Sequence, residues 1–277
     1  MIRALTILIS LLSIGEAHAA LPRVVSTGVC ADQYLLALAA PEQIAGLSPD
    51  ARDPALSAGA QAAQRFPALP LNAESILLAH PDIVLTEGFV SSRMAPFLVR
   101  QGIRFETLPT PETLDGVEQA LREIGALIGR AQAGEAAARA LAAARAALAQ
   151  QAPADPPGAL YLLPTGTTAG ARTYIDEVMR LGGFANIAAR QGVKGWDRVP
   201  LETLVEAPPR IVIASFFDLA DTTALAGFAA TPLARRTLAG AQVISVPNAL
   251  WVCAGPTLLD AARYLQAHNH ALLREAP

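Results

Sequence analysis

The chain has 277 residues, of which 52% are hydrophobic, and this is enough for one large domain or for two domains of ordinary size. The same composition excludes a disordered chain. With 21 basic and 24 acidic side chains, a formal net charge of −3, the sequence has neither the basic surface that attracts nucleic acid nor a polybasic signal for a membrane. We therefore expect no nucleic-acid partner.

Residues 1–19 have the pattern of a secretory signal peptide. Arg3 supplies the positive start, Ala4–Ile14 form an apolar run, and Ala17-His18-Ala19 offers a cleavage site of the small-x-small type. The run is shorter than the roughly 20 residues of a transmembrane helix, although a retained signal anchor is an alternative. No cysteine follows the run to carry a lipid. We expect an exported, soluble product that starts at Ala20.

Short β-rich runs alternate with helical patterns from residue 23 to residue 107. Strands are predicted at 23–27, 44–48, 82–86 and 103–107, and helices at 32–38, 72–79 and 91–101. Such alternation is typical of an α/β lobe with a mainly parallel sheet. We assign residues 20–130 to this N-terminal lobe.

The segment 114–151 is rich in Ala, Leu, Arg, Glu and Gln and contains no Pro, which predicts helices. A break near Gly129 leaves a second helix at Ala131–Gln151, roughly 30 Å long. A helix of this length can cross between two lobes, so we assign residues 131–152 to an interdomain helix. An ordinary surface helix is the alternative.

Residues 153–277 repeat the alternation of strands and helices predicted for the first lobe. Strands are predicted at 159–163, 211–213 and 242–246, helices at 173–181, 231–239 and 256–273, and a Gly/Thr-rich loop at 164–172. Residues 200–213 also match residues 72–85 at a constant offset of 128 positions, which places Glu202 on Glu74 and Pro209 on Pro81. The repeated pattern consists of a helix, a proline that ends it and a buried strand. Its occurrence at two places in the sequence predicts two similar lobes. The predicted fold class is α/β, with two Rossmann-like lobes, central parallel sheets and one long connecting α-helix.

Ligands in α/β proteins bind at the carboxyl ends of parallel strands, so the loops there hold the candidate site. Aromatic and arginine side chains in these loops suit stacking and anion contacts, although each is equally compatible with a surface charge or a core edge. The candidate ligand-binding residues are Cys30, Arg52, Phe89, Arg172, Tyr174, Phe216, Trp251 and Cys253, with Arg93 and Phe217 as further members of the loops.

Cys30 and Cys253 are the two cysteines of the chain, and one lies in a predicted cleft loop of each lobe. In an oxidising compartment an even pair favours a disulfide, which requires Cα atoms within about 7 Å. Two unrelated buried thiols, or two thiols that flank a ligand, are the alternatives.

The sequence gives little support to the hypothesis that the protein is an enzyme. The chain has no Gly-x-Ser-x-Gly elbow, no Walker-type Gly-Lys-Ser/Thr motif and no Gly-x-Gly-x-x-Gly after a strand. His80, His268 and His270 are too scattered for a site that binds bare zinc or manganese. We expect neither a resident cofactor nor a protein-bound metal, and an exported α/β enzyme is the rival reading.

Several motifs in a fixed order resemble one family. They are Arg23-Val24-Val25-Ser26, Asn72-x-Glu74-x-Ile76 through Pro81-Asp82-Ile83-Val84-Leu85, Gly182-Gly183-x-x-Asn186-Ile187-Ala188, and Leu201-Glu202-x-Leu204 through Pro209-x-Ile211-Val212-Ile213. From about Arg23 to Leu273 the chain resembles the periplasmic substrate-binding proteins of ABC importers for cobalamin and ferric siderophores. The resemblance implies two α/β lobes on one long helix, a ligand in the cleft between them, and a monomer in the periplasm.

The same resemblance implies a role for one glutamate on each lobe, since such proteins use them to dock onto arginines of an inner-membrane ABC permease. Glu74 and Glu202 stand at the matching positions. Ordinary helix capping explains a first-turn glutamate equally well.

The implied ligand is a metal chelate. Trp and Phe side chains suit a cobalamin-like corrinoid, and the arginines suit a ferric siderophore. Heme is a further alternative, with Tyr34, Tyr174 or Met94 as iron ligands. The loops 29–33 and 251–256 depart from the usual family pattern, so they leave the choice among these chelates open.

Overall fold

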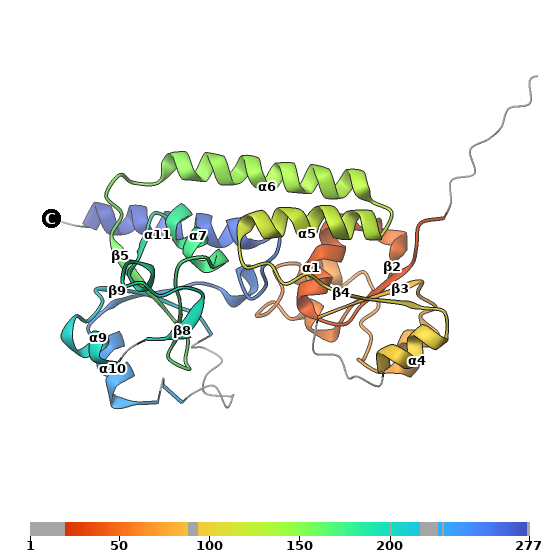
Figure 1. Ribbon diagram of the computed structural model, residues 1–277, viewed down its shortest axis with the longest axis horizontal. Coiled ribbons are helices and arrows are strands. Elements are labelled where there is room, and N and C mark those ends of the chain that lie inside the picture. Colours follow the sequence, from red (N-terminus) through yellow and green to blue (C-terminus); the bar gives the residue numbers. More distant parts are fainter. Residues whose placement is uncertain (1–19, 88–93, 200, 217–226, 229, 276–277) are drawn as a thin grey trace, which may run out of the picture.

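The computed structural model describes residues 20–87, 94–199, 201–216, 227–228 and 230–275. Two lobes lie side by side, and the long helix α6 (Ala131–Gln151) runs along both of them (Figure 1). Each lobe contains a parallel sheet flanked by helices, which confirms the predicted α/β class. Residues 1–19, Phe89, Arg93 and Phe217, all named in the predictions, lie outside the described residues.

The sheet of the first lobe has the strand order β2-β1-β3-β4, and all its pairs are parallel. Its strands are β1 (Val24–Ser26), β2 (Ile44–Gly46), β3 (Ile83–Thr86) and β4 (Arg104–Thr107). The helices of this lobe are α1 (Val29–Leu38), α2 (Ala60–Ala63), α3 (Ala73–Leu78), α4 (Met94–Arg100) and α5 (Leu114–Leu127), with short 3-10 turns at Pro41–Gln43 and Pro49–Arg52.

The second lobe repeats this plan with the strand order β10-β9-β5-β7, again parallel throughout. Its strands are β5 (Gly158–Leu162), β7 (Ala185–Asn186), β9 (Ile211–Ala214) and β10 (Gln242–Ser245). The helices are α7 (Tyr174–Leu181), α8 (Ile187–Arg190), α9 (Leu201–Glu206), α10 (Pro232–Ala239) and α11 (Leu258–Glu275), with a 3-10 turn at Asn248–Leu250.

The sequence repeat has a direct structural meaning. Its two apolar triplets form β3 and β9, and each of these strands has a neighbour on both sides, β1 and β4 for β3 and β5 and β10 for β9. A strand enclosed in this way and covered by helices on its faces is buried on both, so it needs continuous apolar residues rather than an alternating pattern. The repeat therefore marks the central strand of each lobe.

One predicted loop contains a strand. The Gly/Thr-rich segment 164–172 is not a plain loop, because Thr167–Ala169 form strand β6, which pairs antiparallel with β8 (Trp196–Arg198). The β-branched residues Thr167 and Thr168 suit a strand. Their partner lies about 30 residues further along the chain, so the local pattern gave no sign of the pairing.

Close packing of helices α5 and α6 explains two glycines. A Cβ atom built on Gly125 would lie 2.7 Å from the Cα of Gly134, and one on Gly134 would lie 2.5 Å from the carbonyl oxygen of Leu121. Glycine at both positions thus lets the two backbones touch. Helix α6 also contacts α1 in the first lobe and α7 and α11 in the second.

The largest buried cluster is continuous through both lobes. It includes Val24 and Leu35 of the first lobe, Leu141 of α6, and Val178 and Leu265 of the second lobe. Because this apolar core is shared, the lobes resist large relative movements. Among the described residues, no helix combines the length and the apolar character needed to cross a membrane.

Candidate functional site

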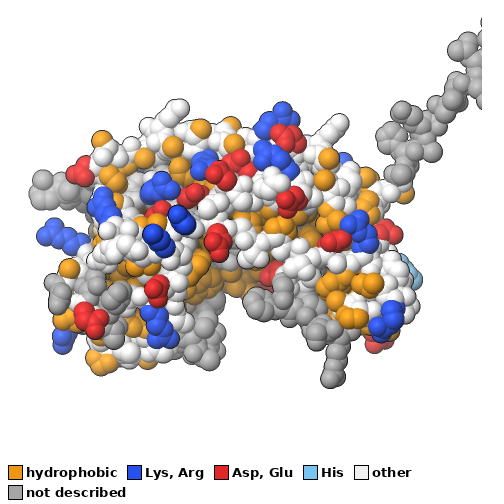
Figure 2. Space-filling model, in the orientation of Figure 1, with side chains coloured by type: hydrophobic (Ala, Val, Ile, Leu, Met, Phe, Trp, Pro, Cys, Tyr) orange, Lys and Arg blue, Asp and Glu red, His pale blue; other side chains and the backbone are white. Residues whose placement is uncertain are grey.

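The carboxyl ends of the two sheets approach each other between the lobes. A cavity of about 210 Å³ lies there, beside the N-terminus of α1. The first lobe contributes Cys30, Glu87 and the segment 108–111 to its wall, and the second lobe contributes Ala254. Figure 2 shows hydrophobic side chains gathered in this middle region, below a ridge of charged residues over α5 and α6. The cavity therefore lies where the strand-end rule predicts a ligand site.

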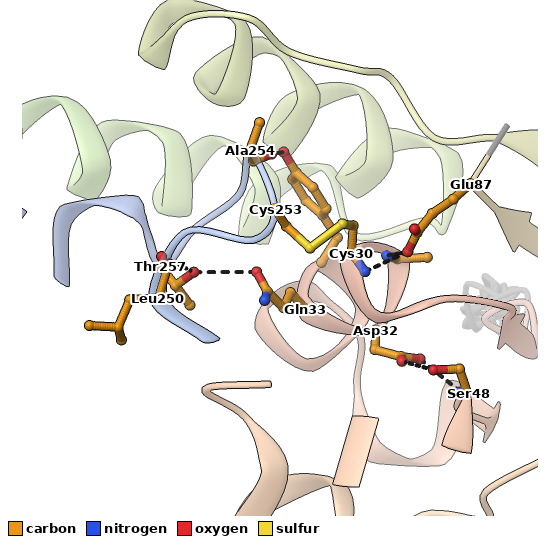
Figure 3. The surroundings of a disulfide bond; sticks show 11 residues. Cys30, Asp32, Gln33, Ser48, Glu87, Leu250, Cys253, Ala254 and Thr257 are labelled. Atoms are coloured by element: carbon orange, nitrogen blue, oxygen red, sulfur yellow. Dashed lines mark hydrogen bonds between the residues drawn. A yellow bond between two sulfur atoms is a disulfide. The ribbon is translucent and has the colours of Figure 1, made fainter. Parts of the chain in front are cut away.

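Cys30 and Cys253 form a disulfide that links the two lobes, with their Cα atoms 5.3 Å apart (Figure 3). Two hydrogen bonds join the same segments. The Tyr34 hydroxyl donates to the carbonyl of Ala254 at 2.9 Å. The Thr257 hydroxyl shares its proton between the carbonyl of Leu250 at 3.0 Å and Gln33 Oε1 at 3.3 Å. The disulfide alternative raised by the sequence is thus the one observed, and free thiols are not present at these positions.

Glu87 holds the N-terminus of α1, and this role was missed in the sequence. The N-cap residue Gly28 has no side chain to accept the first amides of the helix. The carboxylate of Glu87 accepts them instead, from the backbone of Cys30 at 2.5 Å and of Ala31 at 3.2 Å (Figure 3). Because this cap comes from the end of β3, helix α1 starts at Val29, three residues before its predicted start. A glycine at the N-cap was the available signal.

Asp32 is a second carboxylate that fixes α1, and it is fully buried. It accepts hydrogen bonds from the Ser26 hydroxyl at the end of β1 and from the Ser48 backbone at 3.0 Å and hydroxyl at 2.5 Å. Burial raises the pKa of Asp32 to about 6, against the opposing effect of these donors and with a smaller contribution from the negative charge of Glu87. The carboxyl does not line the cavity, so it positions the helix that does.

Four aromatic side chains form a cluster in the second lobe. The Tyr161 ring meets Trp251 edge-on at 5.3 Å between centroids and Trp196 at 6.0 Å, and Tyr174 meets Trp196 at 5.9 Å. Tyr161 and Trp251 are buried, Tyr174 is half-buried, and Trp196 is 42% exposed. Burial raises the pKa of Tyr174 to about 12. The cluster therefore offers two partly open rings, Trp196 and Tyr174, over a buried base.

In this arrangement Trp251 is not a surface ring. Its ring is 1% exposed and packs on Tyr161 beneath the surface, so in this structure it belongs to the core. Trp196, which was not singled out, is the exposed tryptophan instead. It follows Gly195 directly and precedes Asp197, a local pattern typical of a turn, and no element was predicted there.

The other candidate residues are dispersed. Arg52 is half-buried and donates to the carbonyl of Phe66 at 2.5 Å within its own lobe. Arg172 is exposed, with φ of 67°, just before the N-cap of α7. Phe216 has φ of 62°, and its backbone amide donates to Asn248 Oδ1 at 2.9 Å. These contacts hold the three residues in separate places and do not bring them to the cavity.

Glu74 and Glu202 are both exposed and lie in the first turns of α3 and α9. In the first lobe Asn72 caps α3, since its side chain accepts the amide of Ser75 at 2.8 Å. Glu74 is therefore not needed as the cap. Exposed apolar side chains accompany the two helices, at Leu71, Leu78 and Val205.

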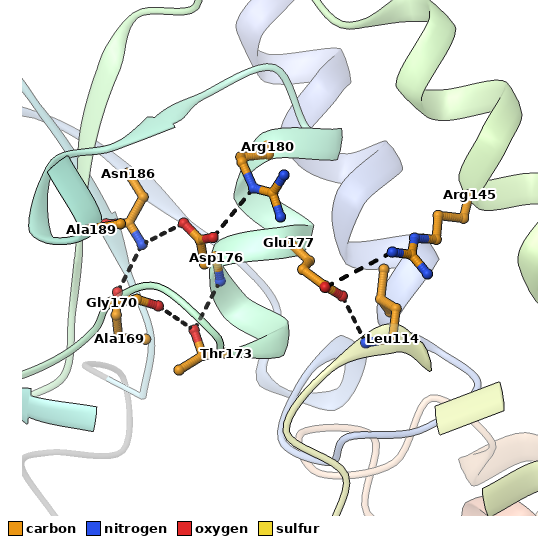
Figure 4. Close-up of polar contacts among 10 residues, drawn as sticks. All are labelled: Leu114, Arg145, Ala169, Gly170, Thr173, Asp176, Glu177, Arg180, Asn186 and Ala189. Carbon is orange, nitrogen blue, oxygen red and sulfur yellow. Dashed lines mark hydrogen bonds and ion pairs between the residues drawn. The ribbon is translucent and has the colours of Figure 1, made fainter. Parts of the chain in front are cut away.

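A second set of polar contacts joins the lobes on the side of α6. Glu177 of α7 accepts the backbone amide of Leu114 at 2.7 Å, and Arg145 of α6 lies 3.9 Å from the same carboxylate (Figure 4). Arg145 also pairs with Asp115 and with Glu118 of α5. A hollow of about 520 Å³ opens here, but its charged lining is already paired.

Metal-binding groups do not converge in the part of the chain that the structure describes. It contains no cluster of three or more His, Cys, Asp or Glu side chains placed to hold an ion. His80 is exposed at the end of α3, and His268 and His270 lie on α11. None of the three lines the interlobe cavity.

Comparison with known proteins agrees with this architecture. Residues 24–248 match the family model described as periplasmic binding protein. No curated protein sequence is significantly similar to the chain. Among solved structures, the periplasmic heme-binding protein RhuT from Roseiflexus sp. RS-1 has 23% sequence identity and a TM-score of 0.64, over 90% of this chain and 100% of that one.

Two structures from Vibrio cholerae are also similar in fold. The periplasmic heme-binding protein HutB has 22% identity and a TM-score of 0.68, covering 89% of this chain and 98% of its own. The periplasmic vitamin B12-binding protein BtuF has 18% identity and a TM-score of 0.61, covering 92% and 99%. At these identities the likeness shows the shared fold alone.

Proposed function

The chain belongs to the periplasmic binding protein family, and we propose that it captures a metal chelate of the corrinoid class between its lobes for an ABC permease of the inner membrane. On this proposal it is a receptor and not an enzyme. It acts as a soluble periplasmic monomer after loss of residues 1–19.

The observation that carries the corrinoid proposal is the aromatic cluster. Trp196 and Tyr174 present partly open rings, and the buried Tyr161 and Trp251 hold them in place from below. Trp251 lies two residues from Cys253, whose disulfide partner lines the interlobe cavity. Rings fixed in this way offer a large apolar surface with little loss of side-chain freedom on binding. A broad, mostly apolar macrocycle suits such a surface.

The chemistry of the cavity also favours a chelate whose metal is already saturated. An iron porphyrin in a protein takes an axial ligand from a side chain such as His, Cys, Met or Tyr. No imidazole lines the cavity among the described residues, and Cys30 is bound in the disulfide. The cobalt of a corrinoid carries its own axial ligands, so it requires no side-chain ligand from the protein.

Heme is the second candidate because of Tyr174. Its hydroxyl is half-buried beside Trp196, so one ring could stack on a porphyrin while the other ligates iron. The raised pKa of Tyr174 opposes the phenolate that binds iron, which places heme second. A ferric siderophore with acidic groups would instead engage the exposed guanidinium of Arg172.

A ligand screen tests the proposal. Thermal unfolding of the mature chain is measured with cyanocobalamin, hemin and a ferric hydroxamate, because a ligand at 100 times its Kd adds about 2.7 kcal/mol to stability. We expect cyanocobalamin to raise Tm most. Trp196→Ala should then weaken cyanocobalamin binding about tenfold, whereas Val243→Ala, on the outer strand β10, should leave it unchanged.

Other results redirect the proposal. Stabilisation by hemin alone, with a Soret band that Tyr174→Phe shifts, would replace the corrinoid by heme. No binding of any chelate, or conversion of a bound one to product, would overturn the receptor proposal.

Docking to the permease is assigned to Glu74 and Glu202. Both are exposed on short helices that lead into the central strands of their lobes, next to exposed Leu78 and Val205. Glu74→Arg with Glu202→Arg should leave chelate affinity within about twofold and abolish uptake in cells, since repulsion replaces attraction at the contact. The matched control reverses one exposed acid per lobe elsewhere, at Glu42 and Asp155. Uptake that survives the glutamate reversals would remove this role.

A further inference from the structure

The two lobes are joined on opposite sides by different kinds of contact. On the side of α6 the joint is extensive, because α6 packs on α1 and α5 of the first lobe and on α7 and α11 of the second. Glu177, Arg145 and Leu114 add polar contacts there (Figure 4). On the side of the cavity, the segment 251–257 meets α1 through the disulfide and two hydrogen bonds. The joint beside the cavity therefore has a single covalent bond, few polar contacts and a share of the common apolar core.

The polar contacts at this joint are imperfect. The bond between Thr257 and Gln33 is 3.3 Å long, near the limit for a hydrogen bond. Two buried donors beside the bridge, Gln33 Nε2 and Trp251 Nε1, have no protein acceptor in the described structure. Because a buried donor without an acceptor costs free energy, parting of the segments would relieve that cost at both atoms.

The geometry also decides which sulfur an external thiol can reach. Cys30 is half-buried and lines the cavity of about 210 Å³, whereas Cys253 is 1% exposed. Attack through the cavity therefore falls on Cys30 Sγ, and Cys253 is the leaving group. The carboxylate of Glu87, bound to the Cys30 amide at 2.5 Å, lies beside this path and repels an anionic thiolate.

From these features we propose that the Cys30–Cys253 disulfide is a thiol-exchange site that clamps segment 251–257 onto α1 and so holds Ala254 in the cavity wall. A dithiol reductant opens the clamp. Its first thiolate bonds to Cys30 Sγ, the Cys30–Cys253 bond breaks, and Cys253 leaves as a thiolate that takes up a proton. The second thiol of the reductant then displaces Cys30. The protein gains two electrons and two protons, and the reductant becomes a disulfide.

The consequence for binding rests on the proposed function. With the clamp closed, the wall from the second lobe stays in place and a captured chelate is retained. With the clamp open, Ala254 moves away with its segment, so the ligand dissociates faster. Reduction thus converts a retaining receptor into a releasing one, while the α6 joint keeps the lobes together.

Hydrogen exchange of the ligand-free protein tests the clamp itself. Amide exchange is compared between the oxidised chain and the chain reduced with dithiothreitol and alkylated. We expect the amides of Ala31, Val252 and Leu258, which bond within or beside the joint, to exchange at least tenfold faster after reduction. The amides of Ile128 and Gly134, at the α5–α6 joint, should exchange at their original rates.

Cys30→Ser with Cys253→Ser is the second arm, and far-UV circular dichroism checks its fold. Its amide exchange rates should match those of the reduced protein and should not change when dithiothreitol is added. Glu87→Gln keeps an oxygen for the α1 amides and removes the charge, so it should speed reduction by glutathione several-fold. Unchanged exchange at the joint, or equal acceleration at both joints, would overturn the clamp.

The binding arm uses cyanocobalamin, whose dissociation should be at least fivefold faster from the reduced protein. An unchanged dissociation rate would refute control of retention. If cyanocobalamin does not bind, the corrinoid proposal fails, and the exchange experiment still decides whether the clamp exists.

Discussion

The buried carboxyl of Asp32 should make the stability of this protein fall as pH rises through the acidic range. In the folded chain its pKa is raised from 3.8 to about 6, mainly by burial. A raised folded-state pKa means that the folded state holds the proton more tightly than the unfolded state, so the stabilisation is complete below pH 3.8 and is lost as pH passes 6. Two pKa units correspond to about 3 kcal/mol.

The clean measurement compares wild type with Asp32→Asn, because other groups titrate in both proteins and cancel. Urea unfolding at pH values from 3.5 to 7.5, followed by circular dichroism, gives the free energy of unfolding of each. We expect the variant to gain about 3 kcal/mol relative to wild type across this range. Any fixed cost of the amide, including its poorer fit to the Ser48 donors, shifts the whole curve without changing its slope.

Ser48→Ala provides an internal control of the cause. The Ser48 hydroxyl donates to Asp32 and lowers its pKa, so its removal should raise that pKa and move the pH window upward. A difference between wild type and Asp32→Asn that stays constant within about 0.5 kcal/mol from pH 3.5 to 7.5 would refute the burial argument.

Three further changes probe the packing of α6 and the contacts between the lobes. Gly134→Val should lower the unfolding free energy by about 1–3 kcal/mol, because the new Cβ atom would lie 2.5 Å from the backbone of α5. Ala140→Val, on the exposed face of α6, is the control and should cost under about 1 kcal/mol. Equal costs for the two variants would contradict the close crossing of α5 and α6. Loss of the disulfide in the double serine variant should cost about 5 kcal/mol by loop-closure entropy over its 223-residue separation, measured by urea unfolding, and a cost below about 1 kcal/mol would refute that account. Arg145→Met should cost only about 1 kcal/mol at low salt and less at 1 M salt, since the side chain is 31% exposed and solvent screens its pairs; a salt-independent cost would point to lost packing instead.

The parts of the fold that rest on local patterns could be predicted from the sequence. The apolar triplets 83–85 and 211–213 become central strands, and residues 131–151 become one helix, because burial on both faces and helix propensity act within a few residues. The strand-end rule also placed Cys30 beside the interlobe cavity.

The parts that depend on distant partners could not. The cap of α1 comes from Glu87, 57 residues beyond the Cys30 amide that it accepts, and β6 finds its partner β8 across another stretch of chain. The two tryptophans differ in exposure, since Trp251 packs beneath Tyr161 and Trp196 lies at the surface. The residues next to them in the sequence do not indicate which tryptophan is buried. The pairing of two cysteines 223 residues apart stayed open for the same reason.

The continuous core sets a limit on how this protein can be divided. Because Leu35, Leu141 and Val178 belong to one buried cluster, a cut at the segment between α6 and β5 would strip each half of part of its own interior. Either fragment expressed alone would expose that apolar surface and collect in aggregates, whereas the two expressed together could reassemble through α6. Although the molecule has two lobes in shape, the shared core predicts that the lobes unfold together.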